Sequence, residues 1–258
     1  MIPALQCLSL ALKTTQSGRK FICAHLSVLF ILLLFAIAFN AWSACVSEQQ
    51  SAQATLQKID SEWPMRGSGD PVSQYVQKLG ARLANVGDYR HYHNWRFSVV
   101  RNLAPNAFSI GDGYVFITDG AVKLTQTESE LAAILAHELG HQLAGHFCNT
   151  ATNEGGLFDI FSAPATSGQQ VGVGSMTQVI DPVKEQQADQ IALSILQNSG
   201  YNPHAMLDIT RRLPSGGAAH LIDVNRLQFL EYSLTNNPPL FIGNSDEFQN
   251  MKRMLSAE

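Results

Sequence analysis

The chain has 258 residues, of which 45% are hydrophobic and 15% charged, and a formal net charge of −4. This length fits one domain with a targeting segment, or two small domains. Residues 45–258 hold 14 basic and 21 acidic residues, a net charge of −7 without any basic cluster, which argues against a nucleic-acid partner.

The first predicted element is an export signal over residues 1–44. Three basic residues precede an apolar run over residues 21–39, and small residues follow it. This order is typical of a bacterial secretory signal. The apolar run is also long enough to cross a bilayer, so an uncleaved membrane anchor stays open as an alternative. We therefore expect an exported, periplasmic protein whose domain occupies residues 45–258.

Cys45 stands where a lipoprotein signal places its lipidated cysteine. Ser43 and Ala44 suit lipidation, whereas Trp42 replaces the usual leucine, and cleavage after Ser43 by an ordinary signal peptidase fits equally well. A lipid on Cys45 would anchor the protein to the outer membrane from the periplasmic side. Without lipid, an oxidising periplasm could join Cys45 to Cys148.

After the signal, the sequence predicts two helices followed by two strands. The helices cover residues 48–63 and 72–84, and the second has apolar residues at helical spacing. The strands cover residues 94–100 and 114–118.

The next predicted helix carries the motif HELGH over residues 137–141, preceded by Thr127 as N-cap and Glu130 as the partner in a capping box. Residues four apart lie on one face of a helix, so His137 and His141 can bind one zinc ion. Glu138 is offset by about 100° and could take a proton from a water that the metal activates. Zinc peptidases use this order of residues.

A catalytic zinc site needs a third protein ligand. His146 is nearby, but the metzincin pattern would place its histidine at Phe147 and a glycine at Ala144, so that pattern fails. Cys148 is a weaker option because a histidine and glutamate set already suffices.

A second helix offers the third ligand. Residues 182–196 are predicted helical, with Asp181 as N-cap, and the helix ends before Gly200. Glu185 and Asp189 lie four residues apart on one face, which by itself also fits a solvated acidic surface. Together with HELGH, the spacing favours Glu185 as a zinc ligand and Asp189 as the carboxylate that orients a ligating histidine.

The segment between the two ligand-bearing helices, residues 149–180, is rich in Gly, Ser, Thr and Gln. It is a candidate lid, and a plain surface loop fits equally well. His220 could approach the metal, although a loop histidine without a role is the simpler interpretation.

Three motifs occur in order: the segment from Asn106 to Gly120, HELGH, and EQQAD over residues 185–189. Together they resemble the gluzincin metallopeptidases related to HtpX and the CAAX prenyl protease, in particular the small periplasmic members of the YcaL and LoiP type. The resemblance implies a mostly helical α+β gluzincin (zincin) domain with a small sheet, one Zn²⁺ per chain and Glu138 as general base. It also implies the metal ligands His137, His141 and Glu185 and a substrate groove lined by Asn106, Ala107 and Phe108.

The resemblance further implies a zinc-dependent endopeptidase acting on misfolded or unassembled envelope proteins. A strand edge beside the metal would hold an extended peptide by main-chain hydrogen bonds. One departure stands out: family members often end with His-Pro and then an arginine, whereas Asn237 precedes Pro238 here and the next arginine is Arg253. A zinc-bound but inactive or self-inhibited, chaperone-like envelope lipoprotein is therefore the alternative.

Overall fold

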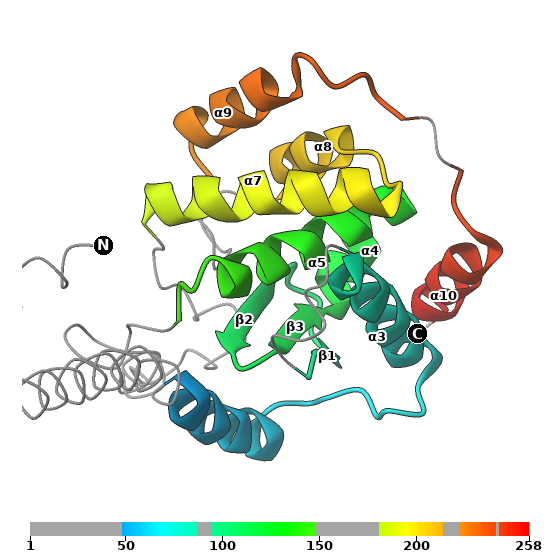
Figure 1. Cartoon of the computed structure of the whole chain (residues 1–258). Helices are drawn as coiled ribbons and strands as arrows, with labels where there is room; N and C mark the ends of the chain where they lie inside the picture. Colours follow the sequence, from blue (N-terminus) through cyan, green and yellow to red (C-terminus); the bar gives the residue numbers. More distant parts are fainter. Residues whose placement is uncertain (1–47, 87–93, 148–180, 214–221, 241–242, 258) are drawn as a thin grey trace, which may run out of the picture. The chain divides into compact units, whose positions relative to one another are not determined.

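The computed structural model describes residues 48–86, 94–147, 181–213, 222–240 and 243–257 (Figure 1). The predicted signal, Cys45, Cys148, the segment 149–180 and His220 lie outside these residues. The described part is mostly helical with a small mixed sheet, which confirms the predicted α+β class. Among the described residues, no helix is both long and apolar enough to cross a membrane.

The two predicted N-terminal helices are confirmed. The first covers residues 48–62, and the second is α3 (Pro71–Ala84). The Asp70 carboxylate caps α3 by accepting hydrogen bonds from the backbone N–H groups of Val72 and Ser73. The apolar stripe of α3 is buried, as its helical spacing predicts.

The sheet has three strands, β1 (Arg96–Val100), β2 (Ala107–Gly111) and β3 (Tyr114–Thr118), in the order β1-β3-β2. β1 runs parallel to β3, and β2 forms an antiparallel hairpin with it. The hairpin turns through residues 111–113, all with positive φ, a conformation that glycine adopts readily and that two glycines here supply. Among the described strands β2 pairs on one side only, so it forms an edge of the sheet.

The sheet separates two apolar clusters because side chains alternate along each strand. Phe108 and Phe116 point to one face, where they pack with Ile59 of the helix over residues 48–62. Val115 and Ile117 point to the other face, toward the main core of helices. The N-terminal helix therefore closes the face of the sheet that the other helices do not cover.

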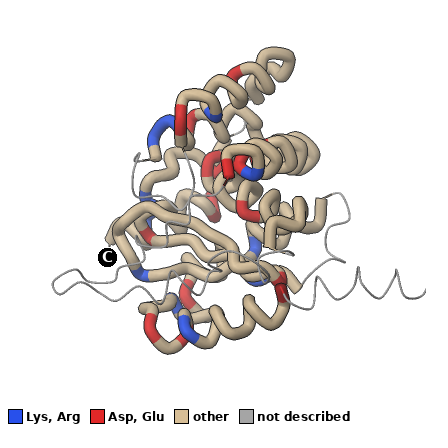
Figure 2. Tube along the Cα trace, turned by 90° about the vertical axis from the view of Figure 1, so that its left-hand side faces the viewer, with Lys and Arg blue, Asp and Glu red and all other residues tan. Residues whose placement is uncertain are grey.

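The remaining helices are α4 (Asp119–Leu124), α5 (Glu128–Leu143), α7 (Pro182–Ser199), α8 (His204–Arg212), α9 (Val224–Leu234) and α10 (Asp246–Ser256). α5 lies between the sheet and α7, and α8 and α9 lie on the α7 side (Figure 1). Lys and Arg are dispersed over the described elements rather than gathered on one of them (Figure 2).

The predicted caps are confirmed. Thr127 caps α5 and Asp181 caps α7, which ends at Ser199 and is followed by Gly200 with φ 77°. The Glu130 carboxylate accepts a backbone hydrogen bond from Thr127, as the capping box predicts. It also accepts hydrogen bonds from the backbone N–H of Gln126 and from the guanidinium of Arg212.

Helices α5 and α7 approach closely at Gly140, the glycine of HELGH. A Cβ atom there would collide with the carbonyl oxygen of Ala188 and lie 2.9 Å from its Cα. Only a residue without a side chain fits this contact. The contact sets the spacing between the helix with both histidines and the helix with Glu185.

Candidate metal centre

Three predicted ligands from two helices meet in the interior. The Nε2 atoms of His137 and His141 lie 3.0 Å apart. Nε2 of His137 is 3.4 Å from Oε2 of Glu185, and Nε2 of His141 is 3.3 Å from Oε1 of Glu185. All three residues are buried, and they form a group of side chains able to hold one metal ion.

These spacings fit a zinc ion. Ligand atoms about 2.0–2.1 Å from a tetrahedral zinc lie roughly 3.3–3.4 Å from one another. Two of the three ligand spacings have these values and the third is slightly shorter. Two imidazoles and a carboxylate are also among the donors that zinc prefers.

The net charge of the site also favours a divalent cation. Glu138, Glu185 and Asp189 are buried carboxylates, each 0–1% exposed. The guanidinium of Arg226, itself buried, is the one arginine that contacts this group among the described residues. With His137 neutral, as a metal-binding histidine must be, three negative charges against one positive charge leave two negative charges in the interior, where unbalanced charge is costly. A divalent cation would neutralise them.

Asp189 contacts the ring of His137, the histidine that the motif pairs with it. Its Oδ1 lies 2.8 Å from Nδ1 of His137. Burial raises the pKa of the Asp189 carboxyl, but the charges of Arg226 and His137 outweigh it and hold the pKa below its ordinary value. An ionised Asp189 accepts a hydrogen bond from Nδ1–H of His137, which leaves the Nε2 lone pair for a metal. His146 supports the other ligand, with its Nδ1 2.9 Å from Nδ1 of His141.

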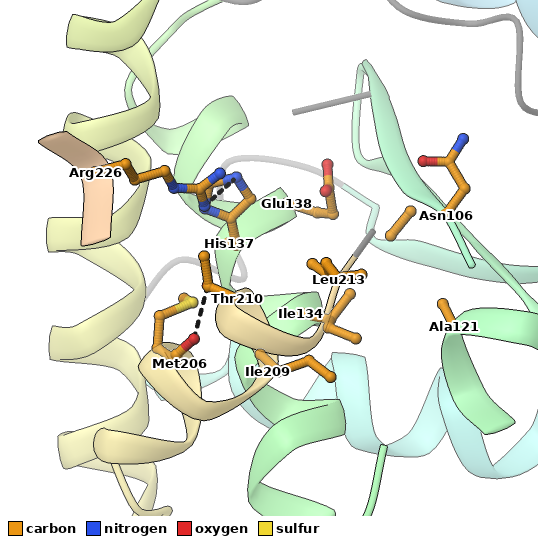
Figure 3. A pocket seen from close by; sticks show the side chains of 11 residues that line it. Asn106, Ala121, Ile134, His137, Glu138, Met206, Ile209, Thr210, Leu213 and Arg226 are labelled. Atoms are coloured by element: carbon orange, nitrogen blue, oxygen red, sulfur yellow. Dashed lines mark hydrogen bonds between the residues drawn. The ribbon is translucent and has the colours of Figure 1, made fainter. Parts of the chain in front are cut away.

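Arg226 is the main residue that the sequence analysis missed. It lies on α9, with Nη1 2.6 Å from Oε2 of Glu185 and with Nε and Nη2 each 2.8 Å from an oxygen of Asp189. Figure 3 shows its guanidinium beside the His137 ring. The family pattern places an arginine after Asn237, whereas Arg226 precedes Asn237. The sequence held one signal for it. Arg226 lies four residues before Leu230 and eight before Leu234, and this spacing places it on the buried, apolar face of the helix.

Asn237 lies away from the ligands. Its side chain accepts a hydrogen bond of 2.6 Å from Gln197 and donates one of 3.0 Å to the Ser233 carbonyl. Gln197 is twelve residues beyond Glu185 on α7, which is about 18 Å along the helix. Asn237, which stands where the family often has histidine, therefore contacts the C-terminal end of α7 rather than the ligand group.

Glu138 has a partner on the edge strand. The Ser109 hydroxyl donates a hydrogen bond of 3.1 Å to Oε2 of Glu138. Ser109 and Ala107 face α5, and Asn106 and Ala107 line a pocket beside Glu138. Phe108 does not join them, because its side chain stacks on Phe116 on the opposite face of the sheet.

The side chain after HELGH ties this strand to the helix. Gln142 accepts a hydrogen bond of 2.7 Å from the Gly113 N–H and donates one of 3.0 Å to the Tyr114 carbonyl. Gln142 is buried, so both bonds form away from solvent. The hairpin that carries Ser109 is thereby fixed relative to the two histidines.

Two histidines and a glutamate on facing helices, with a glutamate following the first histidine, define a zinc metallopeptidase centre of the gluzincin type. Residues 72–234 match the sequence profile of peptidase family M48, and the chain belongs to that family.

Several named proteins are similar to the chain. It is 32% identical to the beta-barrel assembly-enhancing protease of Yersinia pestis over 198 residues, which are 63% of this chain and 39% of that protein. It is 29% identical to the mitochondrial metalloendopeptidase OMA1 of Schizosaccharomyces pombe over 64% of this chain and 52% of that one. Metalloprotease LoiP of Escherichia coli is 23% identical over 65% of this chain and 70% of LoiP. The chain thus spans about half, or less, of the length of the Yersinia and Schizosaccharomyces proteins.

Proposed function

We propose that the protein is a zinc-dependent endopeptidase that cleaves misfolded or unassembled envelope proteins. The observation that carries this proposal is Glu138, a buried carboxylate that directly follows one metal-binding histidine. A structural zinc site is closed by four protein ligands, whereas the described residues supply three. A group of three ligands beside a general base suits hydrolysis better than a structural role.

The proposed ligands are His137, His141 and Glu185. When bound, zinc supplies a Lewis acid that polarises the scissile carbonyl and lowers the pKa of a water molecule. The Glu138 carboxylate takes a proton from that water as its oxygen bonds to the carbonyl carbon. Glu138 then delivers the proton to the peptide nitrogen as the C–N bond breaks, which yields a carboxylic acid and an amine. The Ser109 hydrogen bond holds Glu138 in place for both transfers.

We place the substrate along the edge of β2. Main-chain hydrogen bonds to an edge strand hold an extended peptide with little demand on its sequence, which suits unfolded substrates. All five residues of β2 are buried, so we expect peptide binding to require a local opening at this edge.

We also propose that the protein acts in the bacterial periplasm. The support is the predicted export signal and the similarity to proteins named beta-barrel assembly-enhancing protease. Retention on the outer membrane through a lipid on Cys45 is the finer part of the proposal. Labelling of the wild-type protein with radioactive palmitate, with Cys45→Ser as the control, tests that part.

The experiment on activity compares the zinc-loaded wild-type chain with Glu138→Gln on an unfolded protein such as casein. We expect cleavage by the wild type, and loss of cleavage in Glu138→Gln with one zinc per chain retained. Full activity in the zinc-loaded variant would contradict the role of Glu138. No cleavage by either protein at stoichiometric zinc would favour the inactive or self-inhibited alternative.

A further inference from the structure

The turn of the β2–β3 hairpin is held by a helix that lies outside the residues matched to the family. This helix, over residues 48–62, packs on the opposite side of the sheet from α5 (blue in Figure 1) and precedes residues 72–234. Its first residue, Glu48, is 6% exposed, and Oε1 of Glu48 accepts a hydrogen bond of 3.0 Å from the backbone N–H of Asp112. A helix without any proposed metal ligand therefore contacts the hairpin that carries Ser109.

The contact between this helix and the turn is close. A Cβ atom on Gly111 would lie 2.8 Å from both Cγ and Oε1 of Glu48, so the glutamate side chain rests directly on the glycine. Further along the helix, Gln53 donates hydrogen bonds of 3.2 Å to Oδ2 of Asp112 and of 3.1 Å to the hydroxyl of Tyr114. Two side chains of one helix thus hold the turn.

The backbone of the turn needs this support. Asp112 has a φ of 49° and is the one non-glycine residue with positive φ in the part of the chain that the structure describes. A residue with a side chain seldom adopts this left-handed conformation, and it persists where the surrounding structure fixes it. The bond from the Asp112 N–H to Glu48 is one of the contacts that fix it.

The pairing of β2 with β3 is irregular just before the turn. Ser109 pairs with Val115, whereas Gly111 pairs with Tyr114, so β2 carries one extra residue between these pairs. Such a bulge bends a strand and changes the direction of neighbouring side chains. The direction of Ser109, whose hydroxyl donates to Glu138, therefore depends on how this end of β2 is held.

The two arms of the hairpin are held by different helices. Gln142 of α5 accepts a hydrogen bond from the Gly113 N–H and donates one to the Tyr114 carbonyl, so α5 holds the β3 arm. Glu48 holds the β2 arm through Asp112. Removal of the Glu48 carboxylate should therefore loosen β2 and leave β3 in place.

We propose that Glu48 is a positioning residue for the proposed catalytic base. Its carboxylate fixes the turn at Asp112, the turn fixes the end of β2, and β2 presents the Ser109 hydroxyl to Glu138. This inference rests on the proposed peptidase function. It makes catalysis depend on a helix that precedes the residues matched to the family.

Hydrogen exchange tests the first step independently of catalysis. Mass spectrometry follows exchange in peptides that cover residues 107–112 and 114–118 of the whole chain. We expect Glu48→Ala to exchange about tenfold faster over residues 107–112, while residues 114–118 keep their rate. Glu48→Gln keeps an acceptor oxygen and should exchange like the wild type. Gln49→Ala, an exposed change in the same helical turn, is the matched control. Unchanged exchange over residues 107–112 in Glu48→Ala would overturn the proposal.

A double-mutant cycle tests the link from Glu48 to the base. In the zinc-loaded chain, Glu48→Ala should lower kcat about three- to tenfold, with zinc content and KM unchanged. Glu48→Gln should keep the wild-type kcat. If Glu48 acts through Ser109, its removal should change kcat by less than about twofold once Ser109→Ala is present. Independent, additive losses of kcat would overturn the proposal and leave the peptidase function intact.

Failure of the peptidase function gives a different result. A wild-type chain that cleaves nothing at stoichiometric zinc would contradict that function. The exchange measurement would still decide whether Glu48 holds β2, because it requires no turnover. Faster exchange over residues 107–112 in Glu48→Ala would support the hold of Glu48 on the strand, and unchanged exchange would overturn it.

Discussion

Asp189 binds two site residues at once. One of its carboxylate oxygens lies 2.8 Å from Nδ1 of His137, and both oxygens accept hydrogen bonds of 2.8 Å from Arg226. The carboxylate thus joins a metal ligand on α5 to an arginine on α9. Its own helix, α7, also carries the ligand Glu185.

Removal of the Asp189 charge should weaken metal binding. Partners that orient metal-binding histidines typically contribute about 10–100-fold in affinity, so we expect Asp189→Asn to lose zinc affinity by a factor in this range. Titration against a zinc chelator measures the affinity. Asp208→Asn, an exposed change on α8, is the control and should bind zinc like the wild type.

Removal of Arg226 should destabilise the fold. Arg226→Met leaves Glu185 and Asp189 buried without the guanidinium that pairs with both, a loss of about 3–5 kcal/mol in the free energy of unfolding of the zinc-free protein. Urea denaturation with and without zinc measures it, and zinc should restore part of the loss. Arg211→Met removes an exposed ion pair and should have little effect. Equal stability of the two variants would contradict the role of Arg226.

Removal of the Ser109 hydroxyl should slow catalysis without releasing zinc. We expect Ser109→Ala to lower kcat about tenfold, since a hydrogen bond to a charged group contributes about 1.5–3 kcal/mol, while KM and zinc content stay unchanged. Steady-state kinetics and metal analysis check this. A change in KM alone would show that Ser109 contacts the substrate instead. Ser61→Ala, an exposed change, is the control.

A methyl group at Gly140 should push the two ligand-bearing helices apart. The Cβ atom of Gly140→Ala has no space against Ala188, and overpacking of this kind costs about 1–3 kcal/mol. We expect lower thermal stability together with weaker zinc binding. Gly69→Ala adds a methyl group with no atom within 4 Å and should change neither quantity.

Stability should fall in acid partly through Glu130. Burial raises the pKa of the Glu130 carboxyl, but hydrogen bonds from Arg212 and Gln126 outweigh it and hold the pKa below its ordinary value of 4.5. A lowered folded-state pKa adds stability above the unfolded-state pKa, and that stability is lost as the pH falls through the folded-state pKa. Glu130→Gln should therefore be less stable than wild type at neutral pH, and the difference should shrink below pH 4.5. Urea denaturation over this range measures it, and a constant difference would contradict the prediction.

Local patterns predicted the helices of the site well. Thr127 and Asp181 mark where the two ligand-bearing helices begin, and four-residue spacing placed His137 with His141 and Glu185 with Asp189. Each of these signals lies within a few residues of the chain. The spacing cannot give the distance between the helices, which the contact of Gly140 with Ala188 sets.

Contacts between distant segments were beyond the sequence patterns. Arg226 reaches residues 37 and 89 positions earlier, and Ser109 reaches a residue 29 positions later. The sequence around Arg226 or Ser109 does not identify the residue that each contacts. The pocket beside Glu138 likewise combines residues of several helices and of β2, so its shape follows from their packing rather than from a motif.

The place of Arg226 in the chain makes the centre dependent on late sequence. A polypeptide truncated before α9 would still carry HELGH and EQQAD, every proposed metal ligand and the base. It would lack the guanidinium that offsets Glu185 and Asp189, and so we expect it to be less stable than the whole chain. We therefore expect peptidase activity to require the segment that carries α9 as well as the motifs that carry the ligands.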